Sequence, residues 1–265
     1  MKFKKSILAK RLGIARSTLY YKSKKDEADE TARTLIEEVM IGNPAYGHKR
    51  IAIELHWNKK KVLRLMKKFG LKPKLRRGKK WQKKGDIGLV PSGYQNLVSN
   101  WCPIEPDVVW FADFTYLRVR DSFLYLATVI DGHSKEILGF ALSHRHNRKL
   151  VKEATLEAIT FRKKLPQIFH SDQGSEYQSE EHLKLLENMG VQVSMSRKSS
   201  PWQNGYQESF YSQFKLELGK LDDLTEGEIV EKIYQQIYYY NHLRIHTTLK
   251  MSPRQYYLNH VNRSV

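Results

Sequence analysis

The sequence has a single cysteine, Cys102, among its 265 residues. One cysteine excludes a disulfide scaffold and a zinc site built from several cysteines, and it favours a reducing compartment. No apolar run approaches the roughly 18 residues that a membrane-spanning helix requires. No apolar segment follows the charged residues 1–6, as a signal peptide would require. We therefore expect a cytoplasmic protein that does not enter the membrane.

Acidic residues are scarce in the first third of the chain. Residues 1–85 hold 26 Lys and Arg against 7 Asp and Glu, a net charge of +19, whereas residues 86–265 have a net charge of −1. A basic region joined to a nearly neutral one is typical of a polyanion-binding module attached to a working domain. A solubilising or membrane-surface segment would carry the same charge. The hydrophobic content of 40% is sufficient for a sizeable core.

Residues 1–45 are predicted to form a helix-turn-helix region. Ala9, Gly13 and Leu19 have the spacing at which two short helices cross at a tight turn. The apolar face of the first helix consists of Ile7, Leu8 and Leu12. The side chains that the second helix would present to a DNA groove are Arg16, Ser17 and Thr18. An ordinary helical hairpin is the alternative interpretation.

A helix over residues 26–42 precedes a second predicted DNA-binding unit, residues 46–72, which also resembles a helix-turn-helix. The inward positions of the helix over 26–42 are Leu35, Ile36, Val39 and Met40. In the second unit, Asn58 caps a helix that Gly70 ends. One face of that helix carries six cations: Lys59, Lys60, Lys61, Arg64, Lys67 and Lys68. No acid on the same helix pairs with them, so we expect phosphate contacts, although a solvated face would have the same composition.

Residues 73–104 are predicted to be a basic linker, because they show no hydrophobic period. Trp81 within it could stack on a nucleic acid base, or the whole stretch could be a mobile tether. Residues 105–221 then follow the order βββαβαβα, which indicates an α/β domain with a mixed sheet. The expected strands are 108–119, 122–131, 136–143, 166–170 and 191–195. The expected helices are 150–161, 180–189 and 204–218, and a helical segment fills residues 222–265.

Three acidic residues occupy unusual places in this domain. Asp113 lies inside the first strand, Asp172 follows the fourth, and Glu208 lies early in the helix over 204–218. A carboxylate in apolar surroundings is costly unless a partner or a cation compensates it. Mg²⁺ prefers oxygen ligands, and two such ions can assist phosphodiester cleavage. We therefore expect the three acids to meet at a divalent metal site.

Several neighbours of the acids have two interpretations each. Lys215 lies two helical turns after Glu208 and could bind a phosphate or remain in solvent. Trp202 and Asn204, in the loop before Glu208, are candidate substrate contacts. His170 could donate a proton, but we favour a structural role for it, as we do for Asp131. Glu176, four residues after Asp172, is expected to be exposed.

These motifs in combination resemble those of the DDE transposases of bacterial insertion sequences, which share the retroviral integrase core. The resemblance is strongest to the second-frame (OrfB-type) proteins of the IS-three group, and it covers nearly the whole chain. Asp172 and Glu208 are separated by 35 residues, the acidic spacing typical of that family. The surrounding sequences are Trp-Phe-Ala-Asp at 110–113, His-Ser-Asp-Gln-Gly at 170–174, and Gln-Asn-Gly-Tyr-Gln-Glu at 203–208. Ile245 departs from the pattern, because the family usually has proline there.

The resemblance implies a ribonuclease H-like fold: a mixed sheet flanked by helices, preceded by an all-α DNA-binding region. It also implies a Mg²⁺- or Mn²⁺-dependent strand cleavage and strand transfer, with Asp113, Asp172 and Glu208 holding two ions. The implied partners are double-stranded DNA of the element ends and target, further copies of the chain in a synaptic complex, and an upstream-frame DNA-binding protein or fusion. The implied location is the bacterial nucleoid.

Two other classes of protein remain open on the residues alone. A non-catalytic DNA-binding repressor would use the same basic helices, but it would not need three acids together. A ribonuclease H-type nuclease would need the acids but would not join strands.

Overall fold

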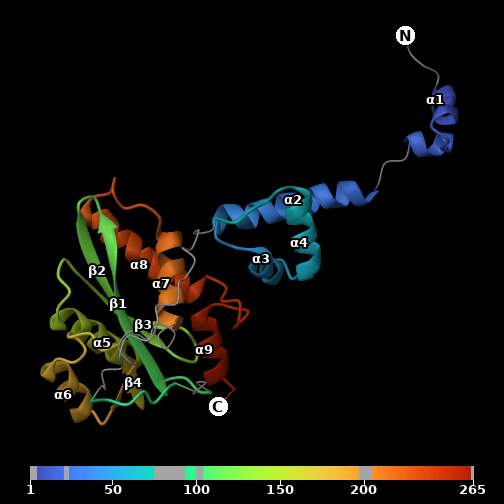
Figure 1. The fold of residues 1–265 in the computed structure, drawn as a ribbon. Helices are drawn as coiled ribbons and strands as arrows, with labels where there is room; N and C mark the ends of the chain where they lie inside the picture. The colour runs from blue at the N-terminus through green and yellow to red at the C-terminus, as the bar shows by residue number, and fades with distance from the viewer. Residues whose placement is uncertain (1–4, 21–23, 75–92, 100–103, 197–204, 264–265) are drawn as a thin grey trace, which may run out of the picture. The chain divides into compact units, whose positions relative to one another are not determined.

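The computed structural model describes residues 5–20, 24–74, 93–99, 104–196 and 205–263. The chain divides into two compact units, residues 1–73 and 74–265, and each is described by itself (Figure 1). Among the described residues, no helix is both long and apolar enough to cross a bilayer.

The first unit begins with α1 (Lys5–Arg11) and a single 3₁₀ turn, η1 (Arg16–Tyr20). Gly13 has φ +64°, so the predicted tight turn is present. The second helix of the predicted pair is reduced to the 3₁₀ turn. Ala9 is buried, but the predicted apolar face of Ile7, Leu8 and Leu12 is exposed. No other described residue of the first unit therefore packs over that face enough to bury it.

Three further helices pack together in the first unit: α2 (Lys24–Gly42), α3 (His48–Glu54) and α4 (Lys59–Lys68). The Asn58 side chain accepts a hydrogen bond from the Lys60 backbone nitrogen at 2.8 Å, so the predicted cap of α4 is confirmed. Val62 and Leu65 on α4 are fully buried, as is Ile36 on α2. Leu35 is 39% exposed, so its predicted inward position is wrong.

The second unit is built on a five-stranded mixed sheet in the order β3-β2-β1-β4-β5. Its strands are β1 (Val109–Val119), β2 (Ser122–Asp131), β3 (Ile137–Ser143), β4 (Ile168–Ser171) and β5 (Gln192–Met195). The first three form an antiparallel meander, and β4 pairs parallel to both β1 and β5. β1 is therefore the central strand of the sheet, and β4 is its neighbour.

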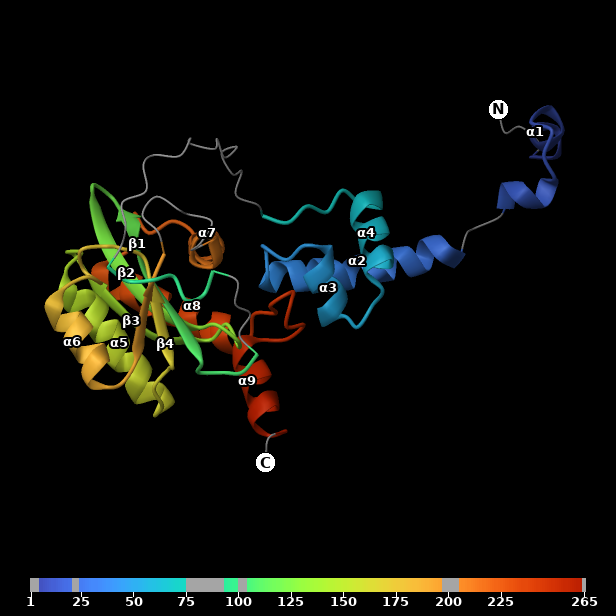
Figure 2. The ribbon, with the colours of Figure 1, turned by 60° about the horizontal axis from the view of Figure 1, so that its bottom comes forward.

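Helices cover both faces of this sheet (Figures 1 and 2). They are α5 (Arg148–Arg162), α6 (Glu180–Asn188), α7 (Gly205–Leu218), α8 (Glu226–His242) and α9 (Pro253–Val261). One core packs α5 and α6 against Trp110, Ala112 and other residues of one face. The other packs α7 and α8 against Leu117, Leu126 and Ile130 of the opposite face. The alternation of side chains along β1 and β2 explains why each strand contributes to both cores.

The last part of the predicted linker lies against the sheet edge. The Leu97 backbone nitrogen donates to Ser194 Oγ at 2.9 Å, and the Met195 nitrogen donates to the Gln95 carbonyl at 3.3 Å. The Tyr94 hydroxyl donates to Glu187 Oε1 at 3.3 Å. Residues 94–97 therefore belong to the folded second unit and cover the edge strand β5. Trp81 lies outside the described residues.

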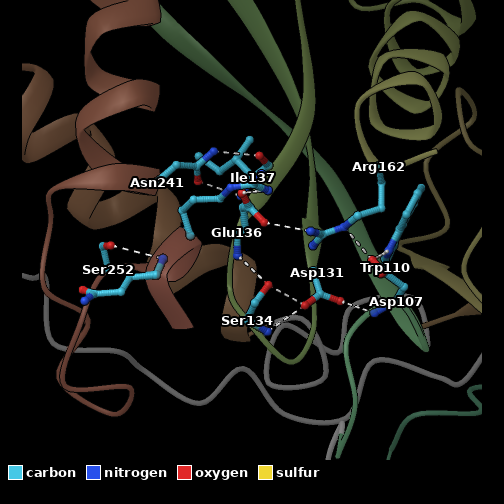
Figure 3. A network of polar contacts seen from close by, with 11 residues as sticks. Asp107, Trp110, Asp131, Ser134, Glu136, Ile137, Arg162, Asn241 and Ser252 are labelled. Carbon is cyan, nitrogen blue, oxygen red and sulfur yellow. Dashed lines mark hydrogen bonds and ion pairs between the residues drawn. The ribbon is translucent and has the colours of Figure 1, made fainter. Parts of the chain in front are cut away.

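A buried polar network joins the C-terminal helices to the sheet (Figure 3). The Asn241 side chain bonds both the nitrogen and the carbonyl of Ile137, at 2.9 and 2.8 Å. Glu136, which is fully buried, binds Arg162 at 3.0 Å and Arg254 of α9 at 3.2 Å. A buried carboxylate with two guanidinium partners has its charge compensated. The residues after 222 are thus part of the same fold as the sheet, and Ile245 is buried within them.

Candidate active site

Asp113 lies in the middle of the central strand and is half-buried. Its Oδ1 accepts a hydrogen bond from the Phe114 backbone nitrogen at 2.8 Å. Because side chains alternate along a strand, Asp113 shares its face with Leu117, which packs beneath α7 and α8. The carboxylate is thus on the side of the sheet that carries α7.

Asp172 follows the last residue of β4. The parallel register ends with the pair Phe111 and His170, and Asp113 and Asp172 each follow that pair by two residues. Neighbouring strands lie about 4.8 Å apart. Both predicted strand acids therefore lie just beyond the same end of the β1–β4 ladder. This edge is where ligands bind in open α/β sheets.

The Asp172 carboxylate is held by its own loop. Its Oδ1 accepts a hydrogen bond from the Gly174 nitrogen at 2.9 Å. Burial raises the pKa of Asp172, and the nearby charge of Glu176 raises it further, against the lowering effect of the Gly174 bond. A carboxylate in this position would be stabilised by a cation, because a positive charge favours the ionised form.

Helix α7 is anchored across β1 by two side chains one turn apart. Gln207 Nε2 donates to the Phe111 carbonyl at 2.9 Å. The Tyr211 hydroxyl donates to the Asp113 carbonyl at 2.6 Å and also bonds Thr128 Oγ1 at 2.8 Å. Glu208 occupies the helix between these two anchors. The backbone of Glu208 is therefore held beside β1, the strand that contains Asp113. The Glu208 side chain, Trp202 and Asn204 lie outside the described residues.

Two buried tyrosines, Tyr177 and Tyr211, have pKa values that respond to the charges of the strand acids. Burial raises the pKa of Tyr177 and Tyr211 well above the ordinary value, and the charge of Asp113 raises both further. Asp172 acts on both phenols in the same direction. Among the described side chains, which do not include that of Glu208, no group of three potential metal ligands occurs.

Lys215 lies two turns along α7 from Glu208. Its Nζ lies 4.5 Å from the centre of the Tyr116 ring, on β1. A cation over an aromatic face is attracted by the ring quadrupole. Tyr116 thus holds the ammonium group near the strand that carries Asp113, and the predicted phosphate contact of Lys215 stays a prediction.

Glu176 was expected to be exposed, and that expectation is wrong. Its side chain is only 10% exposed, and it accepts a bond from His146 Nδ1 at 2.7 Å. Burial alone would raise the pKa of Glu176, but hydrogen bonds from His146 and Ser175 bring it below the ordinary value. The ring of His146 in turn stacks on Phe114, with centroids 6.1 Å apart. The sequence carries no local signal for this pair, because His146 and Glu176 are 30 residues apart.

The preference for a structural role at His170 and Asp131 is supported by their contacts. His170 is fully buried beside Ser194 Oγ at 2.9 Å, and burial lowers its pKa to about 4. Asp131 is also fully buried and accepts bonds from the nitrogens of Asp107 and Ser134, at 2.9 and 2.7 Å. Asp131 closes the turn between β2 and β3.

The candidate DNA contacts in the first unit fall into two groups. Arg16, Ser17 and Thr18 are exposed on η1. Among the six cations of α4, two pair with acids of α2: Arg64 binds Asp29 at 2.6 Å, and Lys68 binds Asp26 at 2.7 Å and Asp29 at 2.9 Å. The acidic partners of these two cations thus lie on α2 and not on α4 itself. The hydrogen bond from Arg64, and after it the one from Lys68, holds the pKa of Asp29 well below its usual range.

The comparisons with known proteins agree with this architecture. Two families described as integrase core domain match residues 103–201 and 189–253. The transposase for insertion sequence element IS904 of Lactococcus lactis is 37% identical over 227 residues, covering 80% of this chain and 87% of that protein. Transposase InsF for insertion sequence IS3A of Escherichia coli K12 is 30% identical over 221 residues, covering 80% of this chain and 76% of the relative.

A solved structure has the same fold. A simian T-cell lymphotropic virus intasome chain, solved in complex with PP2A regulatory subunit B56 gamma, superposes with a TM-score of 0.53 at 15% identity. The match covers 78% of this chain and 70% of that chain. The mixed sheet with helices on both faces is therefore a ribonuclease H-like integrase core. The chain belongs to the DDE transposases of bacterial insertion sequences, which are polynucleotidyl transferases that carry out transposition.

Proposed function

We propose that Asp113, Asp172 and Glu208 are the catalytic acids of this transposase and that they hold two Mg²⁺ or Mn²⁺ ions. The proposal is supported by the β1–β4 register, because Asp113 and Asp172 each follow its last pair, Phe111 and His170, by two residues, and by the anchoring of α7 to β1 through Gln207 and Tyr211. Oxygen ligands of this kind suit Mg²⁺. When bound, such ions activate the attacking oxygen and stabilise the leaving oxygen of a phosphodiester displacement.

The reaction proceeds in two displacements at this site. In the first, water attacks a phosphodiester at the element end, a P–O bond to the attacking oxygen forms, and the bond to the 3′ oxygen breaks. This step leaves a 3′-hydroxyl and a 5′-phosphate. In the second, that 3′-hydroxyl attacks a phosphodiester of the target strand, so one phosphodiester forms as another breaks. The chain's own residues position the phosphate: Gly174 orients Asp172, and Tyr211 holds the backbone of Asp113.

The substrate is double-stranded DNA of the element ends and of the target, bound in part by the basic first 85 residues. Lys59, Lys60 and Lys67 are exposed on α4, and Lys215 lies beside the site. Cations that neutralise phosphates release condensed counterions, which makes the affinity strongly dependent on salt. Pairing of two element ends requires further copies of the chain in a synaptic complex, near the nucleoid, with an upstream-frame protein or fusion as a further partner.

The test is cleavage of a labelled element-end duplex in Mg²⁺ by the parent, by Asp113→Asn and by Asp121→Asn. Asp121 lies exposed in the β1–β2 turn, so its substitution is the matched control. The parent and Asp121→Asn should both nick the end and join it to target DNA. Asp113→Asn should bind the duplex but give neither product. Binding without nicking by the parent would instead support the repressor, and nicking without joined product would support the plain nuclease.

A further inference from the structure

The tip of the β1–β2 hairpin exposes two large aromatic side chains. Tyr116 is 58% exposed and Phe123 is 46% exposed. Their rings meet edge to face, with centroids 5.3 Å apart at an interplanar angle of 81°. The β1–β2 register pairs Tyr116 with Tyr125 and Arg118 with Phe123, so the four side chains lie on one face of the hairpin. Exposed aromatic surface of this size is costly in water unless it has a partner.

This aromatic surface is continuous with rings that contact the loop carrying Asp172. The Tyr125 ring centre lies 5.0 Å from that of His146, and the His146 ring stacks on Phe114, a β1 residue on the face opposite the Asp113 carboxylate. His146 is bonded to Glu176 in the loop that carries Asp172. A chain of rings therefore extends from the loop that carries Asp172, over the face of β1 opposite the Asp113 carboxylate, to the exposed tip formed by Tyr116 and Phe123.

Two cations, Lys215 and Arg118, lie beside the exposed rings. Lys215 Nζ lies 4.5 Å from the centre of the Tyr116 ring, and Arg118 is exposed between Tyr116 and the turn. Arg120 is not counted among these cations, because its side chain donates to the carbonyls of Asp222 and Leu224 and fixes the end of the hairpin. Aromatic rings interleaved with cations are the pattern by which proteins bind single-stranded nucleic acid, the rings stacking on bases and the cations contacting phosphates.

We propose that Tyr116 and Phe123 form a stacking surface for unpaired bases of the DNA strand whose phosphodiester lies at the acidic site. The inference rests on the proposed function, since it takes the substrate to be DNA held at Asp113 and Asp172. Bases in an intact duplex offer no free face to an aromatic ring, so the occupant is a strand that is frayed or already cut. The cations beside the rings favour this polyanion over an apolar protein surface.

The test is binding of a labelled single-stranded oligonucleotide to the full chain in EDTA, where no cleavage takes place. Tyr116→Ala and Phe123→Ala should each weaken binding about 5- to 100-fold, the range found when a stacking ring is removed. Tyr116→Phe should bind as the parent does, because the ring is kept. The slope of log affinity against log salt should be the same for all four proteins, because that slope counts phosphate contacts. Binding of a blunt duplex should change less than twofold.

Two results would overturn the proposal. Unchanged single-strand affinity in both alanine variants would show that the rings do not stack on bases. Unchanged affinity together with a change in sedimentation would assign the surface to contact between copies of the chain. Because catalysis is absent in EDTA, failure here is distinguishable from failure of the Asp113→Asn test of the proposed function.

Discussion

Asp172 is an acid whose charge opposes folding in the absence of a cation. Burial raises its pKa, which means that the ionised form is disfavoured in the folded state relative to the unfolded chain. Glu176 adds to this effect from the same loop. The Asp172 carboxylate is thus held at a cost to stability, in the way that is common for groups whose purpose is chemical.

Asp172→Asn should therefore raise the melting temperature of the metal-free protein at neutral pH while abolishing strand cleavage. The amide oxygen can still accept the bond from the Gly174 nitrogen. Mg²⁺ should raise the melting temperature of the parent, since a ligand that binds only the folded state stabilises it. The variant should respond to Mg²⁺ much less. Thermal melts with EDTA and with Mg²⁺ measure both effects, and a variant less stable than the parent in EDTA would contradict the explanation.

Single residues could be predicted from the sequence where their chemistry conflicts with their surroundings. Asp113 was found because a carboxylate stands inside an apolar strand, and Asp172 because it follows one. Gln207 and Tyr211 were not found, although their spacing of four residues places both on one helical face. Nothing in the sequence tells which strand that face will meet. The His146–Glu176 bond depends on two loops meeting, and no local pattern encodes that.

At the scale of elements, the contact between β3 and α5 depends on Gly139. A Cβ at this position would lie 2.3 Å from the Ala154 carbonyl oxygen and 2.4 Å from the Ala158 nitrogen. Both are backbone atoms of α5, so a rotamer change cannot relieve the overlap. The helix can approach the strand this closely only because Gly139 has no side chain.

Gly139→Ala should lower the free energy of unfolding by about 3 kcal/mol, the upper end of the cost of overpacking. Gly227→Ala is the matched control, because nothing lies within 4 Å of a Cβ on this α8 residue. The control should be neutral or stabilising by up to about 1 kcal/mol, since alanine favours a helix over glycine. Urea unfolding of the two variants measures the difference, and equal stabilities would contradict this account of the β3–α5 contact.

The cations of α4 fall into two groups: Arg64 and Lys68 pair with acids of α2, whereas Lys67 is an exposed candidate for DNA binding. Lys67→Gln should weaken duplex binding and reduce the slope of log affinity against log salt by about 0.9, as expected for one lost phosphate contact. Arg64→Gln should mainly loosen α2 against α4, because Asp29 loses its bidentate partner. Gel shifts over a KCl series measure the first effect, and amide exchange in α2 measures the second. A larger change in salt slope for Arg64→Gln than for Lys67→Gln would reverse the assignment.

The helices and strands themselves were largely predictable. The cap at Asn58 and the meander from β1 to β3 follow from local residue patterns, so they appear where the sequence places them. The second helix of the N-terminal pair differs from the expectation, since its described residues, Arg16–Tyr20, form a 3₁₀ turn. The partners of the α4 cations could not be predicted, because they lie about 35 residues away on α2.

For the whole molecule, the sheet needs the residues after 222 to complete its second core. Ile229, Ile233, Ile237 and Tyr240 of α8 pack with Leu126 and Ile130 of β2. Glu217 of α7 also pairs with Arg244 at 2.7 Å, and both side chains are buried. A boundary at residue 221 is natural in the sequence, where the acids and the loop after Leu221 interrupt the hydrophobic pattern. Packing across the sheet shows that this boundary does not separate two cores.

A fragment of residues 93–221 should therefore fail to fold, whereas residues 93–263 should give a cooperative unit. Loss of α8 exposes apolar side chains that are now fully buried, each worth about 1.5–3 kcal/mol. Circular dichroism and urea unfolding of the two fragments check the expectation. Arg244→Met in the full chain should destabilise the fold less than removal of α8. It leaves Glu217 buried without its ion-pair partner, which should lower the free energy of unfolding by about 3–5 kcal/mol. A stable shorter fragment would contradict this role of α8.

The late position of α8 has a consequence for synthesis of the protein. A ribosome completes Asp113 and Asp172 roughly 70 residues before Tyr240, which at about 5–20 residues per second is an interval of about 4 to 14 s. During that time, the side of the nascent sheet carrying Leu126 and Ile130 lacks α8, and until α7 is made it lacks that helix as well. Products terminated in this interval contain both strand acids without the helix that completes the core. We therefore expect such truncated chains to be substrates for chaperones and proteases and to have no activity on DNA.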